Sequence, residues 1–190
     1  MHCTTTPYLN SQNILPSIEE LIKTIWSKYG ENISMDIMII GGSALALKYN
    51  LRGTCDIDAE IRTSNIILSE CVKETAERIG VFPDFVNSEF MKSYSYSRYL
   101  WNYVVPVSQY RNVRVFVIND VAQLVMKLVS GRIKDMDDID FLANCCIRQG
   151  IRWSAVEQVH KVLYGDSYGT GMKRTAVQTA RRVFRRAKLL

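Results

Sequence analysis

The sequence predicts an α/β (α+β) fold in which a small domain with a mixed sheet precedes a C-terminal helical bundle. The run Ile37-Met38-Ile39-Ile40 is continuously apolar and stops at two glycines, as expected for a buried strand. Residues 54–61 alternate between apolar or small side chains and polar ones, which is typical of a strand with one covered face. After Asn119 the periodic segments all have helical spacing. We therefore expect one domain over residues 1–119 and a helical domain over residues 120–190.

The composition is that of a folded protein with a basic surface. Hydrophobic residues make up 47% of the 190-residue chain, which argues against disorder. The formal net charge of +5 and the pI near 9.0 favour an anionic partner such as a nucleotide or a nucleic acid. The five cysteines form no C-x-x-C pair, so we expect reduced thiols and no zinc site. No run of eighteen apolar residues occurs, and we expect a cytoplasmic protein without a membrane partner.

Helices and strands alternate in the predicted first domain. We expect residues 1–16 to form a loosely held arm. Ser17 and Glu20 match a capping box, which predicts a helix that starts there and ends near Gly30. Periodicity and glycine positions then predict a strand over 35–40, a helix over 43–49, a strand over 54–61 and a helix over 65–79.

The later part of the chain moves from strands to helices. Residues 81–86 and 103–107 have weaker strand patterns, and the tyrosine-rich segment 90–103 has no clear period. Residues 113–118 are β-branched or aromatic at most positions and predict a strand. Helical patterns follow over 121–130, 135–148, 154–164 and 171–190.

The acidic face of the strand over 54–61 needs an explanation, because it carries Asp56, Asp58 and Glu60. The first two are two residues apart, so their carboxylates project from one face with Cα atoms about 7 Å apart. Such a pair can share Mg²⁺, which takes its other ligands from water and substrate phosphates. The alternative is a tight turn followed by an edge strand with solvated acids.

The glycine pair before this strand suits a phosphate group. Gly41 and Gly42 allow the backbone to approach phosphates closely, and a helix starting near Ser43 would offer N–H groups and a favourable dipole. Neither a Walker loop nor a dinucleotide fingerprint is present. These features together predict a site for a metal-bound nucleoside triphosphate.

Three ordered motifs resemble those of known nucleotidyltransferases. Ile40-Gly41-Gly42-Ser43 followed by Asp56-Ile57-Asp58-Ala59 resembles the signature of the DNA polymerase β-like nucleotidyltransferase superfamily. Arg52-Gly-Thr54-Cys-Asp56-Ile-Asp58 is similar to the form seen in AbiEii-like nucleotidyltransferases, the toxin halves of some bacterial toxin–antitoxin and phage-defence pairs. Related uncharacterised bacterial nucleotidyltransferases resemble this chain at Pro83-Asp84-Phe85-Val86-Asn87 and at Met126-Lys127-Leu128 with Arg132 to Ile139. The resemblance spans residues 35 to 145.

The resemblance implies roles for the matching residues. Asp56 and Asp58 would bind the metal and act in catalysis, and Lys127 would contact the nucleotide or its phosphates. Asp135 or Asp138 would complete the later motif, and the candidate catalytic residues are Asp56, Asp58, Lys127 and Asp135. The candidate nucleotide-binding residues are Gly41, Gly42, Ser43, Arg52 and Thr54.

Several of these positions have simpler explanations. Asp135 and Asp138 can satisfy the N–H groups at a helix start, and Lys127 can reach the solvent from an apolar helix. Many superfamily members also supply a third carboxylate from a later strand, whereas residues 113–118 contain none. The possible substitutes are Glu60, Asp84 and Asp120.

These observations predict Mg²⁺-dependent transfer of a nucleoside monophosphate from a nucleoside triphosphate to a hydroxyl on tRNA, a protein or a small molecule. A cognate antitoxin is a possible partner, and the alternative is a catalytically silent nucleotide- or RNA-binding module. Residues 171–190 contain seven Lys or Arg and no acid. Helical spacing places Ala176, Val177, Ala180, Val183, Phe184 and Ala187 on a packed face and Arg181, Arg182, Arg185 and Arg186 outward. The outer face is either a solvated surface or an RNA-binding stripe.

Overall fold

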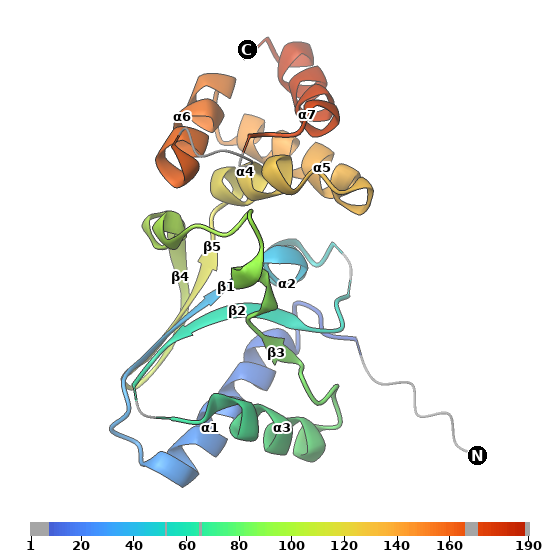
Figure 1. Cartoon of the computed structure of the whole chain (residues 1–190). Coiled ribbons are helices and arrows are strands. Elements are labelled where there is room, and N and C mark those ends of the chain that lie inside the picture. The colour runs from blue at the N-terminus through green and yellow to red at the C-terminus, as the bar shows by residue number, and fades with distance from the viewer. Residues whose placement is uncertain (1–7, 52, 65, 166–170, 189–190) are drawn as a thin grey trace, which may run out of the picture. The chain divides into compact units, whose positions relative to one another are not determined.

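A five-stranded mixed sheet with its helices forms the first of two units (Figure 1). The computed structural model describes residues 8–51, 53–64, 66–165 and 171–188. Unit 1 contains the described residues up to Glu89 together with Val105–Val117, and unit 2 contains Phe90–Val104 and the described residues from Ile118 onward. The sequence predicts a single boundary near residue 119, but the structure groups the tyrosine-rich segment with the helices. Hydrogen bonds from Ser97 to the Leu163 carbonyl and from Tyr164 to the Ser95 carbonyl explain this grouping.

The sheet has the strand order β3-β2-β1-β5-β4. Strand β1 pairs antiparallel with β2 and parallel with β5, and β2 pairs parallel with β3. Ile37 of β1 lies opposite both Ile61 and Val115, which fixes the register. The elements are α1 (Ile14–Tyr29), β1 (Met35–Ile39), α2 (Gly41–Tyr49), β2 (Ile57–Arg62), α3 (Leu68–Ile79), β3 (Val86–Asn87), β4 (Val104–Tyr110) and β5 (Val113–Ile118). The predicted mixed-sheet fold is therefore confirmed.

One face of the sheet is apolar and packed. Ile37, Ile57 and Val115 share this face and are fully buried, because side chains of paired residues point the same way. Figure 1 shows α1 and α3 side by side against the sheet. Burial of this apolar face is the main force holding the sheet to its helices.

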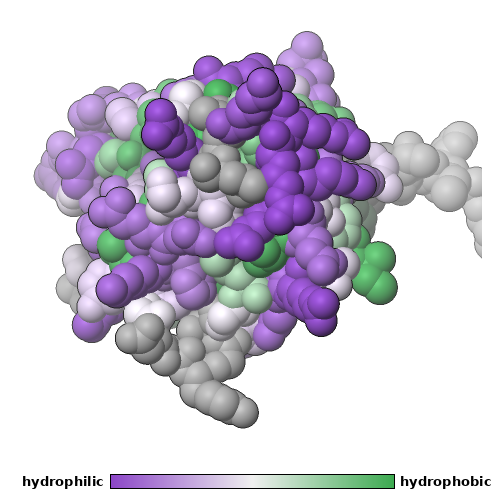
Figure 2. Space-filling model, turned by 90° about the horizontal axis from the view of Figure 1, so that it is seen from above, coloured by the Kyte–Doolittle hydropathy of each residue, from purple (hydrophilic) through white to green (hydrophobic). Residues whose placement is uncertain are grey.

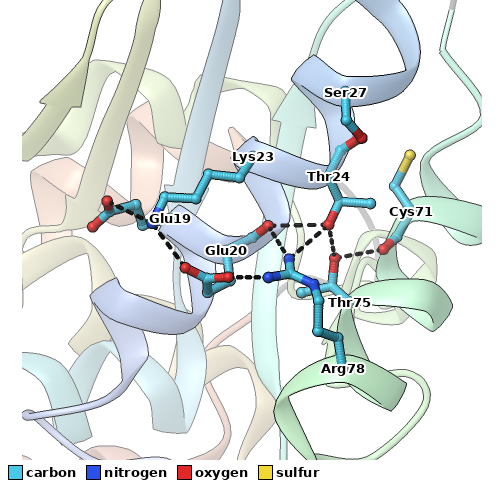
Figure 3. Close-up of polar contacts among 8 residues, drawn as sticks. All are labelled: Glu19, Glu20, Lys23, Thr24, Ser27, Cys71, Thr75 and Arg78. Carbon is cyan, nitrogen blue, oxygen red and sulfur yellow. Dashed lines mark hydrogen bonds and ion pairs between the residues drawn. The ribbon is translucent and has the colours of Figure 1, made fainter.

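Polar contacts join α1 to α3 (Figure 3). Arg78 pairs with the Glu20 carboxylate and donates to the Thr24 hydroxyl at 2.9 Å. The buried Thr75 hydroxyl bonds both Thr24, at 2.8 Å, and the Cys71 carbonyl, at 2.7 Å. These contacts satisfy polar groups that would otherwise be buried unpaired between the two helices.

The other face of the sheet carries the charged residues of the strands. The register aligns Arg62, Asp36 and Arg114 across β2, β1 and β5, and Arg114 forms two 2.7 Å hydrogen bonds with Asp36. Asp58 and Glu60 lie further along this face of β2. The predicted alternation is thus observed from Ile57 onward, where Asp58 and Glu60 share the polar face. The strand begins later than predicted, and Asp56 lies in a bend before it.

The structure corrects the N-terminal predictions. Helix α1 begins at Ile14, so Ser17 lies buried inside the helix and does not cap it. Pro16 is tolerated because it lies in the first turn, where the N–H groups have no intrahelical acceptor. Leu9 is buried and pairs with Thr54 through two 2.8 Å backbone hydrogen bonds. The part of the predicted arm that the structure describes is therefore anchored to unit 1.

The strand expected over 81–86 is mostly a turn. Pro83 favours a turn after Phe82, which is closed by a 3.0 Å hydrogen bond from the Phe85 N–H to the Phe82 carbonyl. Only Val86 and Asn87 pair with β2. The short strand β3 therefore places Asn87 beside Asp58.

Unit 2 is helical, as predicted for the C-terminal part of the chain. Its elements are η1 (Glu89–Lys92), η2 (Arg98–Tyr103), α4 (Asp120–Ser130), η3 (Ile133–Asp135), α5 (Met136–Arg148), α6 (Trp153–Tyr164) and α7 (Arg174–Arg186). Helix α5 packs against α4 and α7, and α4 packs against α6. The Trp153 and Phe184 rings meet edge to face at 5.5 Å in its core. Within the described part of the chain, no helix has the length and apolar character needed to cross a membrane.

Candidate functional site

Asp58 lies at the start of β2, next to the edge strand β3, and Asp56 lies in the bend directly before β2. Asn87 donates from Nδ2 to Asp56 Oδ2 at 2.9 Å. The Thr54 hydroxyl lies 3.0 Å from the Asp56 carbonyl and 3.2 Å from Asp56 Oδ1. Both oxygens of this half-buried carboxylate therefore meet neutral partners, and Asp56 forms no ion pair with any described residue. The carboxylate is held in place while its negative charge remains uncompensated by these residues.

Gly41 lies directly against the second carboxylate. Its φ of +66° is in the left-handed region, and a β carbon at this position would come within 3.3 Å of Asp58 Cγ and closer still to Oδ2. The Ile40 N–H donates to the Asp58 carbonyl at 2.9 Å, which fixes the two segments together. Glycine is required here for both its backbone conformation and its lack of a side chain.

Helix α2 begins at Gly41, two residues earlier than the sequence pattern predicts. The glycine pair thus forms part of the first helical turn, whose N–H groups have no acceptor within the helix. The Ser43 hydroxyl is buried and donates to the Ile40 carbonyl at 2.7 Å, so it stabilises the turn. The start of this helix and its positive dipole end lie beside the Asp58 carboxylate.

The structure gathers most of the predicted nucleotide-binding residues around the acid pair. A β carbon at Gly42 would lie 3.8 Å from the Thr54 hydroxyl, which joins the helix start to the loop before β2. Gly41 is therefore close to Asp58 and Thr54 is close to Asp56, while Gly42 faces the Thr54 hydroxyl and Ser43 lies in the same first turn of α2. Arg52 lies outside the described residues.

Lys127 and the later acids form a separate, buried ion cluster in unit 2. The ammonium of Lys127 lies 2.9 Å from Asp135 Oδ1 and 2.7 Å from Asp138 Oδ2. Arg132 makes a two-pronged contact with Asp135 at 2.7 and 3.2 Å, and the Ser130 hydroxyl adds a bond at 3.1 Å. The side chains of Lys127, Asp135 and Asp138 are each at most 8% exposed. The cluster joins α4, the turn after it and α5.

The cluster corrects both simpler explanations for these residues. Lys127 does not reach the solvent, since its ammonium is buried between two carboxylates. Asp135 occupies the position before α5, but its side chain makes no capping hydrogen bond to that helix. Burial opposes the charge of Asp135, but hydrogen bonds from Arg132 and attraction to Lys127 outweigh burial and lower its pKa. Asp135 is therefore held in its charged form.

The three candidates for a further carboxylate have different surroundings. Glu60 is buried and accepts from Arg62 Nε at 2.9 Å. Asp84 is exposed in the turn before β3, and Asp120 is buried in α4 with a hydrogen bond from Gln149. Among the residues that the structure describes, no three His, Cys, Asp or Glu side chains are close enough to hold a metal ion together. A metal at Asp56 and Asp58 would need other ligands from outside these side chains.

Asn87 is a site residue to which sequence reasoning gives no role. The resemblance marks the segment 83–87 but does not say which of its side chains matters. The structure shows that Asn87 pairs in register with Asp58 and bonds to Asp56. In the sequence, Asn87 is marked only by its position, as an amide residue that directly follows a turn and two apolar residues.

The C-terminal helix differs in part from its predicted faces. Ala176, Ala180, Val183 and Phe184 are buried as predicted, but Val177 is only half-buried and Ala187 is exposed because α7 ends at Arg186. Arg181 is also half-buried, and its guanidinium stacks on Trp153 at 5.0 Å. Arg182, Arg185 and Arg186 point outward.

Comparison with known families places these observations in context. Residues 15–176 match the family DUF6036, described as a nucleotidyltransferase of unknown function. The chain belongs to this nucleotidyltransferase family. The matched range includes the acid pair, the glycine turn and the Lys127 cluster, and it ends in the first turn of α7. No curated protein and no solved structure matches the chain.

Proposed function

We propose that this nucleotidyltransferase uses Mg²⁺ to transfer a nucleoside monophosphate from a nucleoside triphosphate to a hydroxyl acceptor. The observation that carries the proposal is the meeting of Asp56 and Asp58 with the glycine start of α2. Carboxylates attract cations and repel anions, whereas a helix N-terminus attracts anions. A triphosphate bound to a divalent cation satisfies both, because its metal favours the carboxylates and its phosphates favour the helix start.

The residues present fit Mg²⁺. Asp56 and Asp58 offer hard oxygen ligands, and Asn87 and Thr54 hold the Asp56 carboxylate through neutral groups that leave its charge intact. Asp56 and Asp58 would hold the ion, and phosphate and water oxygens would supply its remaining ligands. The metal would stabilise the negative charge that builds up on the phosphate oxygens during transfer.

The chain's own residues orient the triphosphate in this proposal. The N–H groups of Gly42 and Ser43 in the first turn of α2 would bind phosphate oxygens, and the Ser43 hydroxyl would keep that turn in shape. The acceptor oxygen would bond to the α-phosphorus as the bond to the bridging oxygen breaks. Pyrophosphate leaves with that oxygen, and the hydroxyl proton passes to the solvent.

The test is transfer of label from α-labelled nucleoside triphosphates to bulk tRNA, total protein or small hydroxyl compounds in the presence of Mg²⁺. We expect label in one acceptor class with the unaltered protein and none with Asp58→Asn. Glu77→Gln is the matched control, since it makes the same acid-to-amide change at an exposed position of α3. Equal labelling by the Asp58 variant would refute the proposal.

A second candidate function is a catalytically silent nucleotide-binding module. The observation that favours it is the state of Lys127, whose ammonium is held by two buried carboxylates and not by solvent. Lys127 and Asp135 have predicted roles in catalysis, and on this second reading their cluster is purely structural. Tight binding of Mg²⁺-triphosphate without transfer to any acceptor would identify the silent module.

We also propose, from the AbiEii-like motif alone, that the chain is the toxin of a bacterial toxin–antitoxin pair. Expression should then arrest growth, and the double change Asp56→Asn with Asp58→Asn should relieve the arrest. Co-expression of an adjacent small reading frame should relieve it as well. Growth arrest that persists in the double variant would separate toxicity from nucleotide transfer and contradict this assignment.

A further inference from the structure

The outer face of helix α7 is a basic surface. The opposite face of this helix packs into unit 2 through its buried residues Ala176, Ala180, Val183 and Phe184. At 3.6 residues per turn, Arg174, Arg181 and Arg185 fall within about 40° of one another on the outer side. Figure 2 shows a largely hydrophilic surface in the view from above.

Only part of this positive charge is compensated. Arg181 pairs with Glu157 at 2.9 Å and Arg182 approaches Asp140 at 3.5 Å. Arg174, Arg185 and Arg186 are exposed and form no ion pair with any residue that the structure describes. Since residues 171–190 contain no acid, the helix itself supplies no counter-charge.

The basic surface continues past the N-terminal end of α7. Lys173 is anchored by a 2.8 Å hydrogen bond from its N–H to the Leu128 carbonyl, and its side chain lies across Gly131. Its ammonium lies 5.3 Å from the centre of the Tyr94 ring. The turn after Gly131 exposes Arg132 and Lys134, so two basic segments far apart in sequence adjoin at this point.

We propose that this basic surface, formed by Lys134, Lys173, Arg174, Arg185 and Arg186, binds the phosphate backbone of a nucleic acid. The proposal stands apart from the proposed function, because it requires neither a metal nor nucleotide transfer. Helix α7 spans about 18 Å between Arg174 and Arg186 at 1.5 Å per residue. One strand of a duplex presents about five phosphates over that length, at 3.4 Å each.

The composition of the surface favours a nucleic acid over other anionic partners. Arginine presents a planar fork that matches phosphate geometry. A lipid membrane would need the apolar face of an amphipathic helix, but that face of α7 is packed inside unit 2. An acidic protein would need an apolar centre to its interface, whereas the outer face of α7 offers charged and polar side chains.

The test measures binding of bulk tRNA and of duplex DNA of equal charge at 50 to 200 mM salt, without nucleotide or Mg²⁺. The test variant is Arg174→Gln, Arg185→Gln and Arg186→Gln. The control is Lys23→Gln, Lys73→Gln and Arg111→Gln, which removes the same charge from exposed positions of unit 1. Each lost phosphate contact lowers the slope of log affinity against log salt by about 0.9 on a duplex or 0.7 on a single strand.

We expect the affinity gain between 200 and 50 mM salt to be roughly 20- to 40-fold smaller in the test variant than in the control. Tighter binding of tRNA would identify RNA as the ligand, and tighter binding of DNA would identify DNA. Equal salt slopes for the two triple variants would overturn the proposal. It would also be overturned by polyglutamate binding as tightly as either nucleic acid. Asp56→Asn with Asp58→Asn should bind normally, so failure of transfer and failure of binding are distinguishable.

Discussion

The chain contains two aspartate pairs whose surroundings are opposite. Asp56 and Asp58 of unit 1 are half-exposed, and Asp56 is held by the neutral groups of Asn87 and Thr54. Asp135 and Asp138 of unit 2 are buried and share the ammonium of Lys127. The charges of Asp135 and Asp138 are compensated by a buried ammonium, whereas Asp56 has no charged partner among the described residues and can attract a cation. The comparison therefore sets a candidate ligand site in unit 1 against a buried, internally paired cluster in unit 2.

The sharpest way to break this comparison is to make the same change in both pairs. Asp56→Asn with Asp58→Asn should lower transfer by about 10³-fold or more, because the metal contributes several kcal/mol to the transition state. Asp135→Asn with Asp138→Asn should instead lower the free energy of unfolding by about 3–5 kcal/mol, since Lys127 is left buried without a charged partner.

Transfer assays and urea unfolding of both double variants measure these two effects. If the first double variant unfolded as easily as the second, the acid pair of unit 1 would be structural as well. The two aspartate pairs would then not differ in role.

A second way is to fill the space beside Asp58. Gly41→Ala should lower transfer by about 100-fold, because the new methyl group displaces the carboxylate and a 1 Å error in position has effects of that order. Gly80→Ala is the matched control: Gly80 also has a positive φ, +73°, but a β carbon there meets no atom within 4 Å. Both variants should lose about 1–2 kcal/mol of stability from the left-handed backbone. An equal loss of transfer in both would show that the contact with Asp58 is irrelevant.

A third test removes a neutral hydrogen-bond donor of the Asp56 carboxylate. Asn87→Ala should weaken activation by Mg²⁺ by about 10- to 100-fold, which is the usual effect of a residue that orients a metal ligand. The measurement is the Mg²⁺ concentration that gives half-maximal transfer. Asn102→Ala, at an exposed position of η2, should leave that concentration unchanged. An unchanged midpoint in the Asn87 variant would remove Asn87 from the site.

The smallest effect concerns the dependence of stability on pH. Because the pKa of Asp135 is lowered in the folded protein, its charge stabilises the fold above the unfolded pKa, and that stabilisation is lost as pH falls through the lower folded pKa. The difference in unfolding free energy between the unaltered protein and Asp135→Asn should therefore shrink from pH 7 towards pH 2. A difference that stays constant over this range would contradict the charged state assigned to Asp135.

Residue patterns predict where the helices and strands of this protein lie better than they predict which residues contact one another. The apolar run before the glycine pair predicts β1, and the β-branched run over 113–118 predicts β5. Short segments of this composition are most often buried as strands. The capping-box pattern at Ser17 fails because the local motif cannot report that the helix has already begun at Ile14. Patterns of this kind describe neighbours in sequence and not neighbours in space.

The candidate site shows the same limit. The spacing of Asp56 and Asp58 is readable because the two residues are close neighbours in sequence at the start of a strand, and the glycine pair is readable because the Gly41 backbone is unusual. The role of Asn87 depends on the register of β3 with β2, which no local pattern encodes. The pairing of Lys127 with Asp135 likewise depends on the geometry of the turn between α4 and α5.

The Lys127 cluster also has a consequence for the order of folding. Its partners Lys127 and Asp135 are eight residues apart, so α4 and α5 can dock after closing a short loop. The sheet is different, since Asp36 of β1 meets Arg114 of β5 across 78 residues. Contacts between residues close in sequence form faster than distant ones. During synthesis, β1 must wait unpaired on one side until β5 leaves the ribosome, whereas the α4–α5 hairpin can form as soon as its own residues emerge.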